Sequence, residues 1–331
     1  MRFSYIPSLL FVITHIAAAL KPTVVITGAN RGIGLAAVKK LIGTDSYNIV
    51  CLCRSKDRGE KALGGLPGVE VKEVDLSSLK SVKSFTDEWG KHPIDVLVCN
   101  AGIQLSGGSK VAPTRTEDGF EVTVGTNHIG HFVLVNNLLP VVKKRIVWVG
   151  SGVHNPDEAG GDVGSKATLG NMQGLEDGFR DPISMVDGDS YDPDKAYKDS
   201  KLCNVVTSIE FARRLSKKRT GVTSNVMNPG LIPTTGLFRD LNPIFVAIFT
   251  LLTRYVFKVA VSEEEGGRRL AYLISSPALA KITGAYFSGK PGADEFQPIS
   301  PSVEASNTEV GAKLFTATAK ICKAYLSNVL D

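Results

Sequence analysis

The chain has 331 residues, of which 43% are hydrophobic and 21% charged, and it carries a formal net charge of +5. This composition is that of a soluble globular protein and excludes an intrinsically disordered chain. The basic clusters at residues 213–214 and 217–219 gather at one predicted helix end without interleaved aromatic residues. A solvated helix end explains them, and we expect no nucleic-acid partner.

The amino-terminal segment differs in kind from the rest. Residues 5–20 are largely apolar, too short to span a membrane comfortably, and end in Ala17-Ala18-Ala19. This pattern predicts a signal peptide, with a signal anchor as the alternative, so residues 1–20 are excluded from the fold. Residues 21–331 are expected to form a single domain, because no repeat or low-complexity stretch divides them.

Short β-rich apolar runs follow along the chain, most of them separated by stretches with helical period. They are residues 23–27, 48–53, 69–74, 94–99, 145–150 and 222–227, with 284–289 as a candidate last strand. Strands that alternate with helices predict a parallel sheet covered on both faces. The expected fold class is therefore α/β, a Rossmann-like doubly wound sheet.

A glycine-rich turn links the first predicted strand to the first helix. Gly28, Gly32 and Gly34 stand there in the spacing G-x-x-x-G-x-G. A backbone without Cβ atoms can approach a pyrophosphate closely, and the helix amino terminus supplies N–H donors and a positive dipole. The turn therefore predicts a dinucleotide-binding loop.

The end of the second predicted strand indicates which dinucleotide is preferred. An acidic residue there would bind the ribose 2′-hydroxyl of NAD. This strand instead ends in Cys53-Arg54, with Lys56 and Arg58 close behind and Arg31 inside the loop. Guanidinium groups bind phosphate with charge and forked geometry, so we predict NADPH over NADH. For Lys56 and Arg58, a solvated surface role is the alternative.

A tyrosine and a lysine stand four positions apart in "AYKDSKLCN", residues 196–204. On a helix, Tyr197 and Lys201 lie on the same face, where a cation would favour phenolate and lower the pKa of the tyrosine. Such a tyrosine can exchange a proton near neutral pH. An ordinary surface pair on an amphipathic helix is the alternative.

No metal or disulfide site is expected. The five cysteines are odd in number, form no C-x-x-C pair and mostly fall in apolar patterns, which predicts reduced, buried thiols. His128 and His131 stand three apart without a carboxylate or third ligand in a metal-site spacing. A role in helix packing is therefore expected for both histidines.

Several short motifs resemble the short-chain dehydrogenase/reductase family along residues 23 to about 290. They are "TGANRGIG" (27–34), "DL" (75–76), "CNAG" (99–102), Asn127, Ser151, Tyr197-x-x-x-Lys201 and "NPG" (228–230). The resemblance implies that Tyr197 exchanges the proton and that Lys201 lowers its pKa and holds the nicotinamide ribose. It also implies that Ser151 orients the substrate and that Asn127 supports a proton relay through water.

The cofactor-binding residues follow from the glycine-rich turn, the strand end and the resemblance taken together. They are expected to be Gly28, Asn30, Arg31, Gly32, Ile33, Gly34, Arg54, Asp75, Leu76, Asn100, Ala101, Gly102, Tyr197, Lys201, Pro229, Gly230 and Thr234. Within this set, Asp75 and Leu76 are implied to flank the adenine.

Five longer blocks are similar to one branch of that family, the light-dependent protochlorophyllide oxidoreductases. The blocks are residues 120–132, 166–175, 195–204, 234–240 and 261–271. The resemblance implies an NADPH enzyme that reduces a ring double bond of a chlorophyll precursor. One departure is visible, since that branch carries a cysteine directly after the proline-glycine pair, where this chain has Leu231. A leucine side chain has no proton to give.

An apolar stretch at residues 241–262 lies within a lid-like insert at about 231–262. Its nearly unbroken apolar run, Ile244 to Leu252, is too short to span a bilayer, so three interpretations stay open. It is a lid over a flat apolar substrate, a buried packing helix, or a face that rests on a membrane. The oligomeric state also stays open.

The expected function is an NADPH-dependent reductase that passes a hydride, and a proton through Tyr197, to a lipophilic pigment-like substrate. The first alternative is a light-independent enzyme acting on a carbonyl or alcohol of an isoprenoid, retinoid-like or pigment molecule. The second is a binding scaffold without chemistry. The expected location is a plastid reached through the secretory route, with a membrane-associated place in the endoplasmic reticulum as the alternative.

Overall fold

The computed structural model describes residues 21–44, 46–105, 111–179, 181–234, 243–257, 259–289 and 296–330. The targeting segment predicted at residues 1–20 lies outside these ranges. Within them, strands and helices alternate along most of the chain, as the sequence predicts.

The described strands form one eight-stranded sheet in the order β3-β2-β1-β4-β5-β6-β7-β8. Neighbouring strands are parallel except β7 and β8, which are antiparallel. The strands are β1 (Thr23–Thr27), β2 (Asn48–Cys53), β3 (Val69–Glu73), β4 (Ile94–Cys99), β5 (Val142–Val149), β6 (Thr223–Met227), β7 (Tyr286–Ser288) and β8 (Gln297–Ile299). The predicted Rossmann-like α/β fold is confirmed.

The predicted strands match the structure to within one or two residues at each end, apart from larger differences at β5 and β8. β5 begins at Val142, three residues before the predicted start, because exposed lysines at positions 143 and 144 interrupt the apolar pattern. β8 was not predicted at all. It has only three residues, all exposed, and includes Pro298, so no apolar run marks it and its edge position tolerates the proline.

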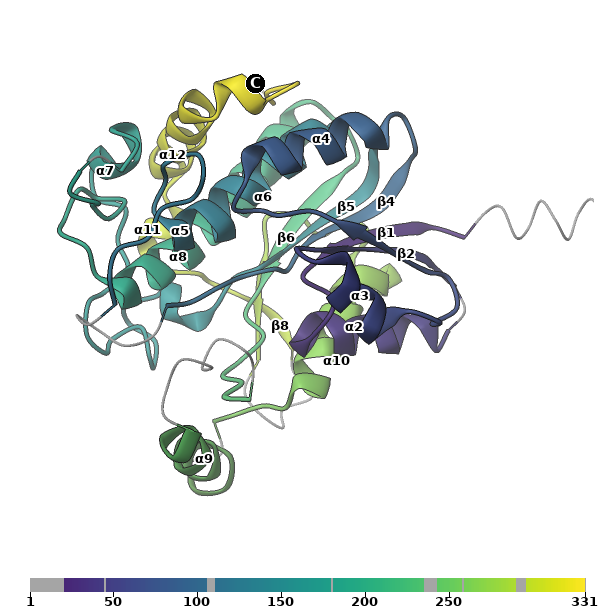
Figure 1. Ribbon diagram of the computed structural model, residues 1–331, viewed down its shortest axis with the longest axis horizontal. Helices are drawn as coiled ribbons and strands as arrows, with labels where there is room; N and C mark the ends of the chain where they lie inside the picture. Colours follow the sequence, from purple (N-terminus) through teal and green to yellow (C-terminus); the bar gives the residue numbers. More distant parts are fainter. Residues whose placement is uncertain are drawn as a thin grey trace, which may run out of the picture.

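Helices cover both faces of the sheet (Figure 1). The face that carries the core around Val24 and Leu270 is covered by α2 (Gly32–Ile42), α3 (Lys56–Leu63) and α10 (Glu263–Ser275). The opposite face, with Phe132 and Trp148 in its core, is covered by α4 (Leu79–Trp89), α6 (Gly130–Leu138), α8 (Pro193–Lys217) and α12 (Thr308–Ile321). The remaining described α-helices are α5 (Val122–Val124), α7 (Gln173–Glu176), α9 (Pro243–Leu251) and α11 (Val303–Ser306), and π-helical turns lie at Gly125–Ile129 and Leu252–Val256.

The strand order indicates at which edge of the sheet a ligand would bind. The chain runs outward from β1 through β2 to β3, then returns to β4 on the other side of β1. At such a reversal the connections leave the carboxyl ends of β1 and β4 on opposite faces, which opens a crevice between them. Parallel sheets of this class bind their ligands there, and the glycine-rich turn follows β1 directly.

Candidate active site

A large cleft opens along the carboxyl edge of the sheet, with a volume of about 2190 Å³. Nearly all of the predicted site residues line it, from the glycine-rich turn at one end to Ser151, Tyr197 and Lys201 further along. The predicted residues that line the cleft are Gly28, Asn30, Arg31, Gly32, Ile33, Gly34, Arg54, Asp75, Leu76, Asn100, Ala101, Gly102, Ser151, Tyr197, Lys201, Pro229 and Gly230. Asn127 and Thr234 are the two predicted residues outside this lining.

The glycine-rich turn packs tightly against the loop after β4. Gly28 has φ of +66°, and a Cβ atom on it would lie 2.8 Å from the Cα atom of Ala101. A Cβ atom on Gly34 would lie 2.6 Å from the Nδ2 atom of Asn100. That amide donates to the carbonyl oxygens of Thr27 and Gly28 at 2.8 and 3.1 Å. The turn therefore needs glycine at both positions, and its backbone is held ready for a pyrophosphate.

A histidine stabilises the turn from inside the protein. The Thr27 hydroxyl accepts hydrogen bonds from the backbone N–H groups of Asn100 and Ala101, and lies 2.8 Å from the Nε2 atom of His131. The Nδ1 atom of His131 lies 2.8 Å from the carbonyl oxygen of Asn127. Burial lowers the pKa of His131 to about 4 and that of His128 to about 3, so both rings are neutral packing groups. This outcome confirms the predicted packing role.

Cations surround the part of the cleft that follows β2. Arg31 and Arg54 line it as predicted, and so do Arg58 and Lys61 of α3. Lys56 does not line the cleft, which agrees with the alternative interpretation of this residue as a surface cation. Lys61 was not predicted, although its position three residues after Arg58 on one helix was a usable signal.

The catalytic candidates meet where β5 ends and α8 begins. Ser151 follows β5, and the Lys201 ammonium lies 5.6 Å from the centroid of the Tyr197 ring and donates to the carbonyl of Val149 at 3.2 Å. Burial lowers the pKa of Lys201 to about 8. We expected Lys201 to lower the pKa of Tyr197. In the structure burial raises that pKa, and the hydrogen bond with Ser151 only partly opposes the effect, because both ring and ammonium are removed from water.

Asn127 stabilises the loop beside these catalytic candidates. It lies in the π-helical turn, is fully buried, and donates to the carbonyl of Ile103 at 2.9 Å and to the Ser200 hydroxyl at 3.0 Å. Its Oδ1 atom accepts from the N–H of Ile103 at 2.8 Å. A Cβ atom on Gly102 would lie 3.4 Å from both that oxygen and the Lys201 ammonium. Asn127 therefore fixes the loop in front of Lys201 rather than lining the cleft.

The other end of the cleft is formed by residues that the motifs did not single out. Residues 158–160 and 163–165 follow Ser151, residues 189–194 precede and begin α8, and Leu231, Phe249, Thr253 and Val259 come from the insert. The carboxyl ends of the strands were the available signal, because the loops that follow them border the same edge.

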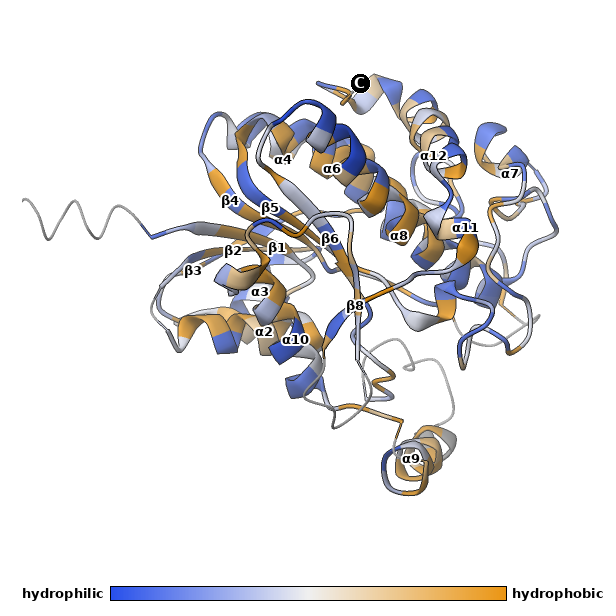
Figure 2. Cartoon of the chain, turned by 180° about the vertical axis from the view of Figure 1, so that it is seen from behind, coloured by the Kyte–Doolittle hydropathy of each residue, from blue (hydrophilic) through white to orange (hydrophobic). Residues whose placement is uncertain are grey.

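The α9 segment turns one side to the cleft and another to solvent. Phe249 and Thr253 line the cleft, whereas Ile244 and Tyr255 are 70% and 67% exposed. Figure 2 shows this apolar segment lying apart from the two helical layers. The side that lines the cleft is consistent with a lid over a substrate. The exposed apolar side is consistent with a face that rests on a membrane. Across the described ranges, no helix is both long and apolar enough to cross a bilayer.

Thr234 lies on the far side of this insert. Its hydroxyl donates to Glu263 at 3.4 Å, and it lines a smaller pocket of about 720 Å³ between α2 and the insert. The structure thus brings Thr234 near the first turn of α2 but not into the large cleft.

Comparison with known proteins identifies the chain's relatives. The short chain dehydrogenase family profile matches residues 22–161. The chloroplastic protochlorophyllide reductase of Daucus carota is 40% identical over 315 residues, which cover 91% of this chain and 78% of the relative. The protochlorophyllide reductase of Avena sativa is 42% identical over 313 residues, which cover 90% of this chain and 98% of the relative. This chain belongs to the short-chain dehydrogenase/reductase family.

Solved structures share the fold of this chain. An uncharacterized protein from Mycobacterium paratuberculosis superposes with a TM-score of 0.69 at 29% identity, covering 95% of this chain and 98% of its own. The Pseudomonas aeruginosa RhlG/NADP active-site complex superposes with a TM-score of 0.61 at 19% identity, which supports the fold alone. It covers 82% of this chain and 95% of its own.

As a short-chain dehydrogenase/reductase, the protein is an oxidoreductase that uses NAD(P). The residues present fit such a cofactor, since the cradle between Gly28 and Ala101 would be filled by a Cβ atom and the cations lie beside it. All five cysteines are buried as free thiols, as predicted. Among the residues that the structure describes, no group of His, Cys, Asp or Glu side chains could hold a metal ion.

Proposed function

We propose that the protein is an NADPH-dependent reductase of a large, lipophilic, protochlorophyllide-like pigment. The observation that supports this best is the cleft itself, whose volume of about 2190 Å³ exceeds the roughly 300–1,000 Å³ typical of a single small-molecule site. One end has the residues for a dinucleotide. The other end is closed by Leu231, Phe249 and Val259, which suit a flat apolar ligand.

The preference for NADPH over NADH is supported by the charges beside β2. The strand ends in Cys53 and is followed by Arg54, so no carboxylate stands where the 2′-hydroxyl of NAD would bind. Arg31, Arg58 and Lys61 line the same part of the cleft. A 2′-phosphate would find several cationic donors there. When bound, the cofactor supplies the hydride.

The protein's own groups supply the proton and the orientation. The Tyr197 hydroxyl, bonded to Ser151, gives a proton to the substrate, and Ser151 holds the substrate against it. Lys201 is 4% exposed and stands ready for the nicotinamide ribose, beside the loop that Asn127 fixes. Phe249 and Val259 give the substrate end of the cleft apolar lining.

Leu231 favours a second candidate function. The residue lines the cleft, and its backbone is fixed by a bridge to Ala260, so an apolar side chain borders the substrate at this point. It has no proton to give. A light-independent reductase or dehydrogenase for a carbonyl or alcohol on a lipophilic molecule needs only Tyr197 as its acid, and therefore fits Leu231 without a further donor.

Illumination separates the two functions. Purified protein is mixed with NADPH and protochlorophyllide in darkness and then exposed to light while absorbance is recorded. The first function predicts pigment loss and NADPH oxidation in equal amounts, only after illumination. If the pigment is unchanged in light while a lipophilic aldehyde is reduced in darkness, the first function is wrong and the second stands. A Tyr197→Phe variant serves as the control for both reactions.

We further propose a plastid location, which rests on the chloroplastic names of the relatives. Entry through the secretory route remains a prediction from residues 5–20. A fluorescent protein fused behind residues 1–20 tests the route. Fluorescence along the endoplasmic reticulum or its derived membranes is the expected result, and diffuse cytosolic fluorescence would contradict it.

A further inference from the structure

Residues 158–165 form one wall of the substrate end, and we call them the cleft wall. Most of them line the cleft, and the Val163 side chain is 68% exposed, so the wall also borders solvent. Its turn is bonded internally, since the N–H groups of Gly161 and Asp162 donate to the Glu158 carbonyl at 2.9 and 3.2 Å. A segment that borders solvent opens easily unless another element holds it. The position of the wall therefore depends on its ties to the rest of the fold.

The start of α8 supplies these ties. The Lys198 ammonium donates to the carbonyl oxygens of Gly161, at 3.4 Å, and of Val163. The Ser165 hydroxyl donates to the carboxylate of Asp192, the N-cap residue of α8. Across the part of the chain that the structure describes, every hydrogen bond between the cleft wall and a helix or strand involves α8 or this N-cap residue.

The same turns of α8 carry the proton donor. Tyr197 directly precedes Lys198 and is bonded to Ser151, whereas Lys198 extends to the cleft wall. One helix thus holds both the wall and the hydroxyl that would act on a substrate. Because a helix is a rigid element, it can keep the wall and the hydroxyl at a fixed separation.

Lys198 is buried among groups that favour its charge. The residue is 7% exposed, and burial lowers its pKa, while the carboxylates of Asp194, Asp162 and Asp192 oppose this effect. A charged ammonium bonds a carbonyl oxygen more strongly than a neutral amine does. The surrounding carboxylates therefore strengthen the tie between Lys198 and the cleft wall.

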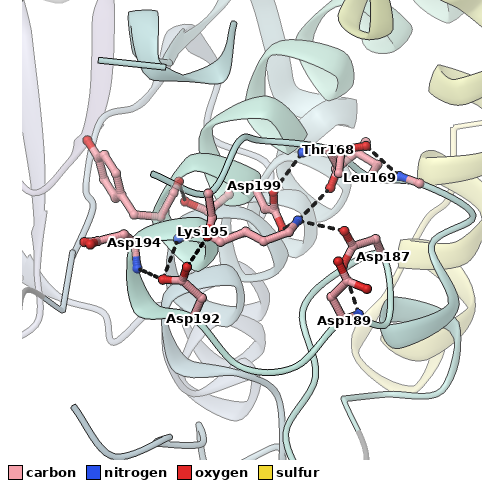
Figure 3. Close-up of polar contacts among 12 residues, drawn as sticks. Thr168, Leu169, Asp187, Asp189, Asp192, Asp194, Lys195 and Asp199 are labelled. Atoms are coloured by element: carbon pink, nitrogen blue, oxygen red, sulfur yellow. Dashed lines mark hydrogen bonds and ion pairs between the residues drawn. The ribbon is translucent and has the colours of Figure 1, made fainter. Parts of the chain in front are cut away.

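A second tie holds the chain just beyond the wall. The Lys195 ammonium lies 2.8 Å from carboxylate oxygens of both Asp187 and Asp199, and donates to the carbonyl of Thr168 at 3.3 Å. Asp199 accepts from the Thr168 N–H at 3.1 Å. Figure 3 shows Lys195 extending toward Asp187, on the side where Asp199 contacts Thr168. Since Thr168 is anchored without Lys198, loss of the Lys198 ammonium should loosen the cleft wall alone.

We propose that Lys198 is a positioning residue, which holds the cleft wall at a fixed distance from Tyr197 and so fits the substrate end to its ligand. The proposal rests on the proposed function for the identity of that ligand. Without the ammonium, the carbonyls of Gly161 and Val163 lose their partner, and the wall opens toward solvent. Pigment binding then weakens, whereas the cofactor end keeps its structure.

Hydrogen–deuterium exchange of the ligand-free protein measures the wall directly. In Lys198→Met, the amides of Gly161 and Asp162 should exchange at least about tenfold faster than in the wild type, because charged hydrogen bonds are lost. Peptides from the middle of α8 should be unchanged, which shows that the variant is folded. Lys198→Arg keeps a charged donor and should exchange more slowly than Lys198→Met.

Lys166→Met is the matched control. It removes an exposed lysine that follows the wall and does not line the cleft, so its exchange should equal that of the wild type. Equal exchange of the wall amides in the wild type and Lys198→Met, or in the arginine and methionine variants, would overturn the proposal.

Pigment kinetics separate positioning from a general loss of structure. In Lys198→Met, the KM for protochlorophyllide should rise about 5- to 20-fold, with kcat within about threefold and the dissociation constant of NADPH within about twofold. A variant that merely unfolds more easily would lose kcat and keep its KM. An unchanged KM would overturn the proposal. Faster exchange of the wall in Lys198→Met, together with no protochlorophyllide binding to the wild type, would support the positioning role and contradict the proposed function.

Discussion

The two ends of the cleft are built in different ways. The cofactor end is made of turns that directly follow β1, β2 and β4, is closed by glycines that admit no side chain, and carries cations. The substrate end is made of longer segments between Ser151 and α8 and after Gly230, and combines carboxylates with apolar side chains. The difference indicates that the dinucleotide site belongs to the fold, whereas the choice of substrate belongs to the inserted segments.

The largest expected effect lies where the two ends meet. Tyr197→Phe removes the hydroxyl that exchanges the proton but keeps the buried ring. We expect turnover to fall by roughly 10²–10⁴-fold, the range typical of a lost general acid. The dissociation constant of NADPH should stay within about twofold, because the ring and Lys201 remain in place. Steady-state kinetics and NADPH fluorescence measure the two quantities, and a variant with undiminished turnover would contradict the assignment.

The buried Lys201 ammonium should lower the free energy of unfolding of the ligand-free protein. Its pKa falls to about 8 from an ordinary value of 10.5, so the folded state binds the proton less tightly than the unfolded chain. This loss of folding stability is fully present below pH 8 and disappears as the pH rises through 10.5. Lys201→Met should therefore raise the free energy of unfolding at pH 7 by roughly 1–3 kcal/mol, and by less at pH 10. Urea unfolding measures this, and a less stable variant at pH 7 would contradict the expected cost.

A third prediction concerns the cations of the cofactor end alone. Arg54→Ser removes a charged donor for the 2′-phosphate, so the dissociation constant of NADPH should rise about 10- to 100-fold while that of NADH changes little. Lys56→Ser is the matched control, since Lys56 lies two residues further on and outside the cleft lining. If both variants weaken NADPH binding equally, general charge attraction explains the preference rather than a phosphate site at Arg54.

The smallest expected effect belongs to the α9 segment. Phe249→Ala removes an aromatic side chain from the cleft lining and should raise the KM for the pigment about three- to tenfold with NADPH binding unchanged. Tyr255→Ala, on the outer side of the same segment, should leave the KM unchanged in detergent-free buffer. A reversal of these two effects would show that the outer side, rather than the inner one, contacts the pigment.

The sequence predicted the cofactor end better than the substrate end, for physical reasons. Glycines after β1 and Arg54 after β2 are tied to strand ends by short connections, so local pattern and position coincide. Glu158, Lys61 and the Asp187–Lys195–Asp199 cluster come together through tertiary packing, which no local pattern records. The acidity of Tyr197 also depends on burial, which the i, i+4 spacing of Tyr197 and Lys201 does not reveal.

For the proposed reaction, one cleft must hold the cofactor and the pigment at the same time. Equilibrium dialysis in darkness, with labelled NADPH and increasing protochlorophyllide, tests this without any turnover. We predict that NADPH stays bound, with an unchanged or lower dissociation constant, while one pigment binds per chain. Displacement of NADPH by the pigment would contradict the division of the cleft into a cofactor end and a substrate end.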